Sequence, residues 1–272
     1  MTKTKEVALT AEQLAILDNS YPVSEESNRI SLPRFGMLSK DIVEVSGSGK
    51  NKVTTVVQSA GTFYTEKDLG ELNDEGKKVW TKEFIGEEVD VIITSERKQL
   101  RKFDKSLNKF ISSDIFDTDD QIVSLYLDKR VISKGTREQL QALYPKLTEK
   151  GKKSSSLNED RILYVIYKGE LHQFNLSTSS KWSFSDYKRQ VGNPSKLVTT
   201  LSSVEETNGS NTYRKVLFTS KGFITATQLE LVQENQAKIN EEVANTATRL
   251  LEKASQPIDR LDEIKADDIS LE

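Results

Sequence analysis

The chain has 272 residues, 35% of them hydrophobic and 30% charged, which is typical of a globular protein with one large or two small domains. It contains no cysteine and one histidine, so disulfides, thiol catalysis, cysteine zinc sites and metal sites that need two histidines are excluded. No apolar run approaches the ~18 residues of a membrane-spanning helix, and the first residues lack the apolar stretch of a signal peptide. We therefore expect a cytoplasmic protein without a membrane span.

The net charge of −3 hides a segregation of charge along the chain. Residues 1–96 carry 11 basic and 17 acidic side chains, residues 97–225 carry 23 and 14, and the last 14 residues carry 2 and 6. This pattern predicts an anionic partner for the middle of the chain. It predicts an autoinhibitory or partner-binding role for the end.

The N-terminal part is predicted to be a short helix followed by a polar linker, together covering residues 1–28. Thr10 to Gln13 form a capping-box pattern, which predicts a helix over residues 11–18. From residue 29 to residue 225 we expect a β-rich core. Within it, residues 41–45, 52–58 and 89–94 are rich in Val, Ile and Thr and are predicted to be strands.

A basic amphipathic helix is predicted over residues 97–109. Leu100, Phe103, Leu107 and Phe110 recur at helical spacing. The remaining positions are rich in basic side chains, and those proposed to contact nucleic acid are Arg97, Lys98, Arg101, Lys102 and Lys105. The alternative is a charged face that only keeps the helix soluble.

The segment after this helix is predicted to contain a strand over residues 121–127, a helix over 137–143 and a loop or domain boundary over 148–160. Residues 161–223 then read as strand, strand, helix, strand and strand. The predicted strands are 161–167, 171–176, 196–204 and 212–219, and the helix is 183–191. The Asn208-Gly209 turn joins the last two strands.

A C-terminal helix is predicted over residues 226–256. Its apolar positions from Leu229 to Leu250 alternate at spacings of three and four, which is a heptad seam with polar interruptions. The seam can pack on its own domain or form a homo-oligomer through residues 229–250. Pro257 ends the helix, and the acidic residues 257–272 are expected to be disordered.

Aromatic and basic side chains of the 161–223 segment are the main candidates for binding single-stranded nucleic acid. Aromatic rings can stack on bases, and Lys or Arg can neutralise phosphates. The candidates are Tyr164, Tyr167, Lys181, Trp182, Tyr187, Lys188, Arg189, Lys196, Tyr213, Arg214 and Lys215. The alternative is that most of the aromatics are core and the basic residues are solvated.

The tail residues Asp262, Glu263, Asp267 and Asp268 are candidates for binding a partner protein. A generic solubilising terminus is the competing interpretation. The single histidine, His172, is interpreted as a structural or surface residue and not as a catalytic one. The sequence predicts no catalytic set, cofactor or metal site, and we therefore expect a protein that is not an enzyme.

The chain resembles the single-stranded-DNA-binding proteins of phages and mobile elements that have an OB-fold-like β core and an acidic C-terminal tail. The resemblance covers about a third of the chain: the strand–strand–helix–strand–strand segment with Trp182 to Tyr187, the strand from Tyr213 to Phe218, and the tail from Ala266 to Glu272. It departs from the small bacterial type in length and in a tail that ends in Ser-Leu-Glu instead of an apolar Phe.

The resemblance implies an α+β fold of mainly antiparallel strands, as an OB-like barrel or sheet, with the C-terminal helix and tail attached. It implies binding of single-stranded DNA in replication or recombination, in a phage context, with replication or recombination proteins recruited by the tail. The alternative function is a structural or assembly protein that works through protein–protein contacts.

Overall fold

The computed structural model describes residues 32–46, 52–73, 78–127, 130–147, 153–209 and 211–255. These residues all belong to one compact unit, Leu32–Glu272. The helix predicted over residues 11–18, the linker before residue 29 and the acidic tail lie outside the described residues.

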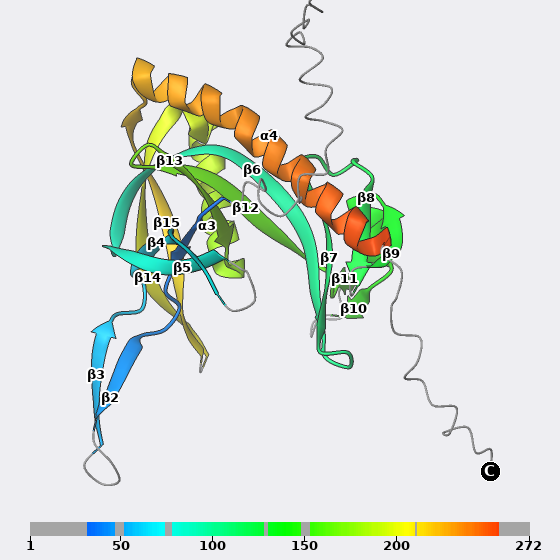
Figure 1. Ribbon diagram of the computed structural model, residues 1–272, viewed down its shortest axis with the longest axis horizontal. Helices are drawn as coiled ribbons and strands as arrows, with labels where there is room; N and C mark the ends of the chain where they lie inside the picture. The colour runs from blue at the N-terminus through cyan, green and yellow to red at the C-terminus, as the bar shows by residue number, and fades with distance from the viewer. Residues whose placement is uncertain are drawn as a thin grey trace, which may run out of the picture. The chain divides into compact units, whose positions relative to one another are not determined.

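Strands dominate the described chain, and Figure 1 labels most of them, numbered in sequence order. The strands are β1 (Arg34–Met37), β2 (Ile42–Ser46), β3 (Val53–Gln58), β4 (Phe63–Leu72), β5 (Lys78–Gly86), β6 (Glu88–Asp104), β7 (Lys109–Phe116), β8 (Val123–Leu127), β9 (Arg130–Gly135), β10 (Pro145–Leu147), β11 (Lys153–Ser155), β12 (Asn158–Tyr167), β13 (Glu170–Leu176), β14 (Leu197–Asn208) and β15 (Asn211–Phe223). The helices are α2 (Arg137–Ala142), α3 (Thr178–Val191), the 3-10 turn η2 (Pro194–Lys196) and α4 (Ala226–Ser255).

The long strand β6 is shared by three neighbours and organises the main sheet. Along one edge it pairs with β12, and along the other it pairs first with β14 and later with β7. Thr94 is an extra residue in the ladder with β12, and its hydroxyl donates to the Tyr164 carbonyl at 3.0 Å. Such a bulge bends a strand. Because of the bend, the first half of β6 pairs with β14 and the second half pairs with β7.

The first core lies on the face of the sheet that α3 covers. Leu163 and Val165 of β12 point to this face and pack with Phe184 of α3, Leu201 of β14 and Val216 of β15. Ser177 begins α3 by accepting a hydrogen bond from the Ser180 amide, and Gly192 follows it with a positive φ of 73°. These caps fix where α3 begins and ends on the sheet.

The second core lies on the opposite face, under α4, which crosses β6, β7 and β9 (Figure 1). Ile162, Tyr164 and Ile166 alternate with the residues of the first core and pack here against Ile239 of α4. Both faces of β12 are therefore covered, which explains its uninterrupted apolar run. The heptad seam packs on its own domain, because Val232, Ile239 and Val243 all contact this cluster.

A third core lies under the short helix α2, at the far end of β6. Leu100, Phe116, Leu125 and Leu140 pack together there. Thr136 caps α2 in a reciprocal capping box with Gln139. This core holds the base of the β6–β7 hairpin.

The expected fold class is confirmed in its coarser form: an α+β protein with mostly antiparallel strands and a C-terminal helix. The pairing of β1 with β13 is parallel. No ladder among the described strands joins β1–β4 to β14–β15, so the sheet is not closed into a barrel. A pocket lined by Met37, Tyr64 and Val216 lies between these strands.

The helix predicted over residues 97–109 is wrong. Residues 97–104 are the second half of β6, residues 105–108 form a turn, and β7 begins at Lys109. The spacing of the apolar residues fits a helix. However, the second half of β6 pairs with β12 along one edge and with β7 along the other, and this pairing stabilises the extended conformation.

The loop predicted over residues 148–160 is also wrong for its described part. Residues 153–155 form β11, which pairs with β10, and β12 already begins at Asn158. In contrast, the strands and the hairpin turn predicted between residues 161 and 223 are confirmed, with α3 starting five residues earlier than expected.

Strands β2 and β3 form a separate two-stranded ribbon, which we call the β2–β3 arm. The Ala60 amide donates to Asp41 at 2.6 Å and the Gly61 amide to the Leu38 carbonyl at 2.8 Å, so the base of the arm is tied to β1 and β4. Its Ile and Val side chains are exposed: Ile42, Val43, Val45, Val53, Val56 and Val57. The arm therefore presents apolar surface without a covering element among the described residues.

Candidate nucleic-acid interface

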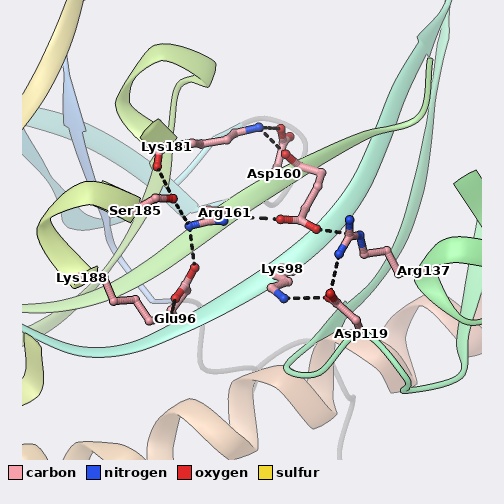
Figure 2. Close-up of polar contacts among 10 residues, drawn as sticks. Glu96, Lys98, Asp119, Arg137, Asp160, Arg161, Lys181, Ser185 and Lys188 are labelled. Atoms are coloured by element: carbon pink, nitrogen blue, oxygen red, sulfur yellow. Dashed lines mark hydrogen bonds and ion pairs between the residues drawn. The ribbon is translucent and has the colours of Figure 1, made fainter. Parts of the chain in front are cut away.

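A band of ion pairs runs between α3 and α2, across β6 and β12 (Figure 2). The Glu96 carboxylate lies 3.3 Å from Arg161 and 2.5 Å from Lys188 of α3. Arg161 also donates to the Ser185 hydroxyl at 2.8 Å. Glu96 is largely covered, with a side-chain exposure of 15%, so its two cations compensate a partly desolvated charge.

The same band continues toward α2. Lys181 lies 3.1 Å from Asp160, and Arg137 of α2 lies 3.0 Å from Glu159. Asp119 binds both Arg137 and Lys98, the latter at 2.7 Å. The hydrogen bond from Lys98 holds the pKa of the Asp119 carboxyl below its usual value, so this carboxylate stays charged over the neutral range.

The band places several of the predicted phosphate-binding residues against carboxylates. It contains six cations, Lys98, Arg101, Arg137, Arg161, Lys181 and Lys188, and four carboxylates, Glu96, Asp119, Glu159 and Asp160. Two positive charges are therefore in excess. Most of the positive charge read from the sequence is compensated locally, because partners distant in sequence meet on the sheet.

Other predicted cations are paired in the same way. Arg97 lies 3.6 Å from Asp117, Arg189 lies 3.2 Å from Asp186, and Arg214 lies 3.2 Å from Glu205. Lys215 pairs with Glu206. Such pairs near the surface contribute about 0.2–1 kcal/mol each, so a phosphate can compete for these cations. Lys105 and Lys196 are exposed.

The predicted aromatic platforms divide into buried and exposed residues. The predicted stacking role of Tyr164 and Tyr187 is wrong, because both rings are buried, Tyr164 under α4 and Tyr187 against Thr199, whose hydroxyl lies 2.7 Å from the tyrosine oxygen. Both faces of β12 are covered, which the alternation of the sequence did not reveal. Tyr167 is half-buried. Trp182 is 73% exposed on α3 and remains a candidate.

Tyr213 is half-buried as well, and its hydroxyl donates to Glu206 at 2.9 Å. That hydrogen bond raises the pKa of the Tyr213 phenol, and Glu206 also binds Lys215. The three side chains form one partly exposed group on the β14–β15 hairpin. Tyr213 and Lys215 thus lie together on the hairpin, with a carboxylate between them.

The tip of the β6–β7 hairpin, Arg101–Phe110, combines exposed aromatic rings with positive charge, and we call it the β6–β7 tip. Phe103 and Phe110 face each other across the strands with ring centroids 4.9 Å apart and are 43% and 54% exposed. The Arg101 guanidinium lies 4.8 Å from the Phe110 ring centroid. These rings are surface residues next to cations, whereas the helix predicted here had made them its apolar face.

The turn of the tip is held by its own polar groups. Asp104 accepts hydrogen bonds from the Ser106 amide at 3.0 Å and the Ser106 hydroxyl at 2.6 Å, which lower the pKa of its carboxyl. Asn108 takes a positive φ of 51°. Within Arg101–Phe110 there are four basic residues and one acidic residue, a net charge of +3.

Sequence reasoning named Arg101, Lys102 and Lys105 but missed Phe103 and Phe110 as surface aromatics. The signal that could have found them is the turn chemistry of Asp104, Ser106 and Asn108 between two phenylalanines. Lys102 lies 4.8 Å above the Tyr144 ring, so it too sits beside an aromatic side chain.

No protein-family model, curated protein or solved structure matches this sequence. Among the described residues, no helix has the length and apolarity needed to cross a membrane. The fold and the β6–β7 tip therefore carry the functional argument.

Proposed function

We propose that this protein binds single-stranded DNA without catalysing a reaction, acting in replication or recombination in a phage context. The observation that carries the proposal is the β6–β7 tip, where Phe103 and Phe110 are exposed beside Arg101 at a net charge of +3. Binding of single strands requires rings that stack on bases and cations that follow the phosphates. The tip offers both within one hairpin.

The rest of the candidate surface supports this proposal in a secondary role. Trp182 offers a further exposed ring, and the band of ion pairs, counted without Arg101 of the tip, has one positive charge in excess. An OB-like architecture, in which a bent sheet around β6 presents the strand-binding surface, fits the sharing of β6 by three ladders. We further propose that the acidic tail recruits replication or recombination proteins.

The proposal predicts salt-dependent binding of oligonucleotides by the full chain. We expect fluorescence polarisation with a labelled oligo-dT to give a dissociation constant of about 1 µM or lower at 50 mM NaCl. If three or four cations contact phosphates, the log–log plot of affinity against salt should have a slope of roughly −2 to −3. Absent or salt-insensitive binding would contradict the proposal, and labelled oligo-rU would show whether the sugar matters.

The second candidate function is assembly through protein–protein contacts, and the β2–β3 arm favours it. The arm exposes six Ile and Val side chains, and an exposed apolar patch of this kind is typical of a protein-binding surface. A two-stranded ribbon is also only marginally stable alone in water, so contact with a partner would stabilise it. If the arm mediates assembly, light scattering after chromatography should give an oligomer mass that does not change when DNA is added. Val43→Lys/Val56→Lys, which charges one cross-strand pair of the arm, should reduce that mass to the monomer's.

A matched control for this experiment is Leu72→Lys, since Leu72 is exposed to a similar degree on β4 but lies outside the arm. Assembly through the arm is contradicted if the wild-type chain is a monomer at ~100 µM, a concentration at which contacts of modest affinity are populated.

A further inference from the structure

A pocket of about 450 Å³ opens between β4, β5 and the β12–β13 turn, and we call it the His172 pocket. Four carboxylates line it, Glu66, Asp68, Glu83 and Glu170, against two lysines, Lys67 and Lys168. The lining thus has an excess of two negative charges, opposite in sign to the β6–β7 tip. A cationic ligand is favoured there and a phosphate is not.

Two aromatic side chains form part of the wall. Trp80 and Tyr167 both line the pocket, and the Lys168 ammonium lies 5.1 Å from the Tyr167 ring centroid. The ring face of Tyr167 therefore already attracts a cation within the molecule. A planar cation can use such faces better than a compact ammonium, because it can also stack.

His172 gives the pocket an acceptor in a covered position. The side chain is only 2% exposed, yet it lines the pocket. Its Nδ1 lies 3.0 Å from the Glu170 carbonyl, an oxygen that can only accept, so Nδ1 carries the proton. Burial lowers the pKa of His172, so the ring is neutral at pH 7 and Nε2 is an acceptor. No partner for Nε2 occurs among the described residues.

We infer that the His172 pocket binds a guanidinium group, which donates to the His172 Nε2 and to the carboxylates while its plane lies against the aromatic wall. A guanidinium has five N–H donors in a fixed plane, which matches several acceptors and a ring face at once. The group could belong to an arginine side chain of a partner protein or to a free guanidinium compound. This inference does not depend on the proposed function, since the pocket and the β6–β7 tip share no residue.

The test uses the full chain and three probes of matched size: the N-acetyl amides of arginine, lysine and citrulline. The chain has two tryptophans, so a Trp182→Phe background makes Trp80 the only indole and its fluorescence a report on the pocket. We expect a saturable change with arginine amide and a dissociation constant of about 1 mM, typical of a ligand of this size. Isothermal titration calorimetry with the wild-type chain measures the same affinity without relying on the indole.

Citrulline amide has the shape of arginine amide without its charge. It should bind at least about tenfold more weakly, because a neutral side chain is not attracted by the excess of carboxylates and makes no cation–π contact. The affinity of lysine amide should lie between those of arginine amide and citrulline amide. Glu83→Gln should weaken arginine amide about two- to fivefold, as expected for one partly solvated carboxylate. Glu87→Gln, an exposed carboxylate outside the pocket, is the matched control and should have no effect.

The inference is overturned if calorimetry detects no binding of arginine amide at ~10 mM, or if citrulline amide binds as tightly as arginine amide. It is also overturned if Glu83→Gln and Glu87→Gln change the affinity for arginine amide to the same extent. The two sources of the group are then separated by two further probes. Methylguanidinium binding as tightly as arginine amide identifies a free compound as the ligand. Tighter binding of the peptide Gly-Gly-Arg-Gly-Gly identifies a protein segment.

Discussion

The double replacement Phe103→Ala/Phe110→Ala is expected to weaken binding of oligo-dT by roughly 30-fold or more. Each ring that stacks on a base contributes about 1–3 kcal/mol, and a tenfold change in affinity corresponds to about 1.4 kcal/mol. The two rings are 43% and 54% exposed and contact each other, so their loss removes a surface pair and leaves the third core intact. Fluorescence polarisation at constant salt measures the effect.

The control for this variant is Phe223→Ala, because Phe223 is 81% exposed at the end of β15 and lies outside the β6–β7 tip. Its affinity should stay within about twofold of the wild type. The slope of affinity against salt should be unchanged in both variants, since no cation is removed. An unchanged affinity of the double variant for oligo-dT would contradict the proposal that the β6–β7 tip binds DNA. The binding surface would then lie elsewhere on the protein.

The replacement with the largest expected effect on stability is Leu140→Ala in α2. Leu140 is fully buried between α2 and the strands β6, β7 and β8, where it packs with Leu100, Phe116 and Leu125. Truncation of a buried leucine lowers the free energy of unfolding by about 2–5 kcal/mol, depending on how far the cavity collapses. Urea denaturation followed by circular dichroism measures this loss.

Leu143→Ala is the matched control, since Leu143 caps the end of the same helix but is 57% exposed. Its free energy of unfolding should change by less than about 0.5 kcal/mol. Equal effects of the two substitutions would mean that α2 does not cover the third core as described. This core holds the base of the β6–β7 hairpin. The Leu140→Ala variant should therefore lose nucleic-acid binding at a lower temperature than the Leu143→Ala variant.

The local patterns of the sequence predicted those parts of the fold that are decided locally. The apolar run from Ile162 to Ile166 predicts a strand, and the apolar seam from Leu229 to Leu250 predicts a helix at nearly the observed position. The Asn208-Gly209 turn defines its hairpin, with Gly209 at a positive φ of 62°. In each case the short-range signal and the tertiary packing favour the same conformation.

The prediction failed where partners distant in sequence decide the outcome. The second half of β6 has helical spacing, yet it is a strand because β12 and β7 flank it. Polar strands such as β4, which reads FYTEKDLGEL, lack the alternation that would identify them. The charge balance of the candidate surface was also hidden, because Glu96 and Lys188 meet across 92 residues of sequence. The excess of basic residues in one segment therefore overstated its local charge.

The sharing of β6 has a consequence for how the chain folds during synthesis. Ile92, in the first half of β6, pairs with Ile166 on one edge and with Val198 on the other, so neither edge of this half is covered until roughly 75 to 105 further residues have been made. At about 5–20 residues per second the ribosome takes roughly 5–20 s to produce them. During that interval Val89, Val91 and Ile93 are exposed on an unpaired strand. The nascent chain is thus most open to aggregation, and to capture by chaperones, before β14 emerges.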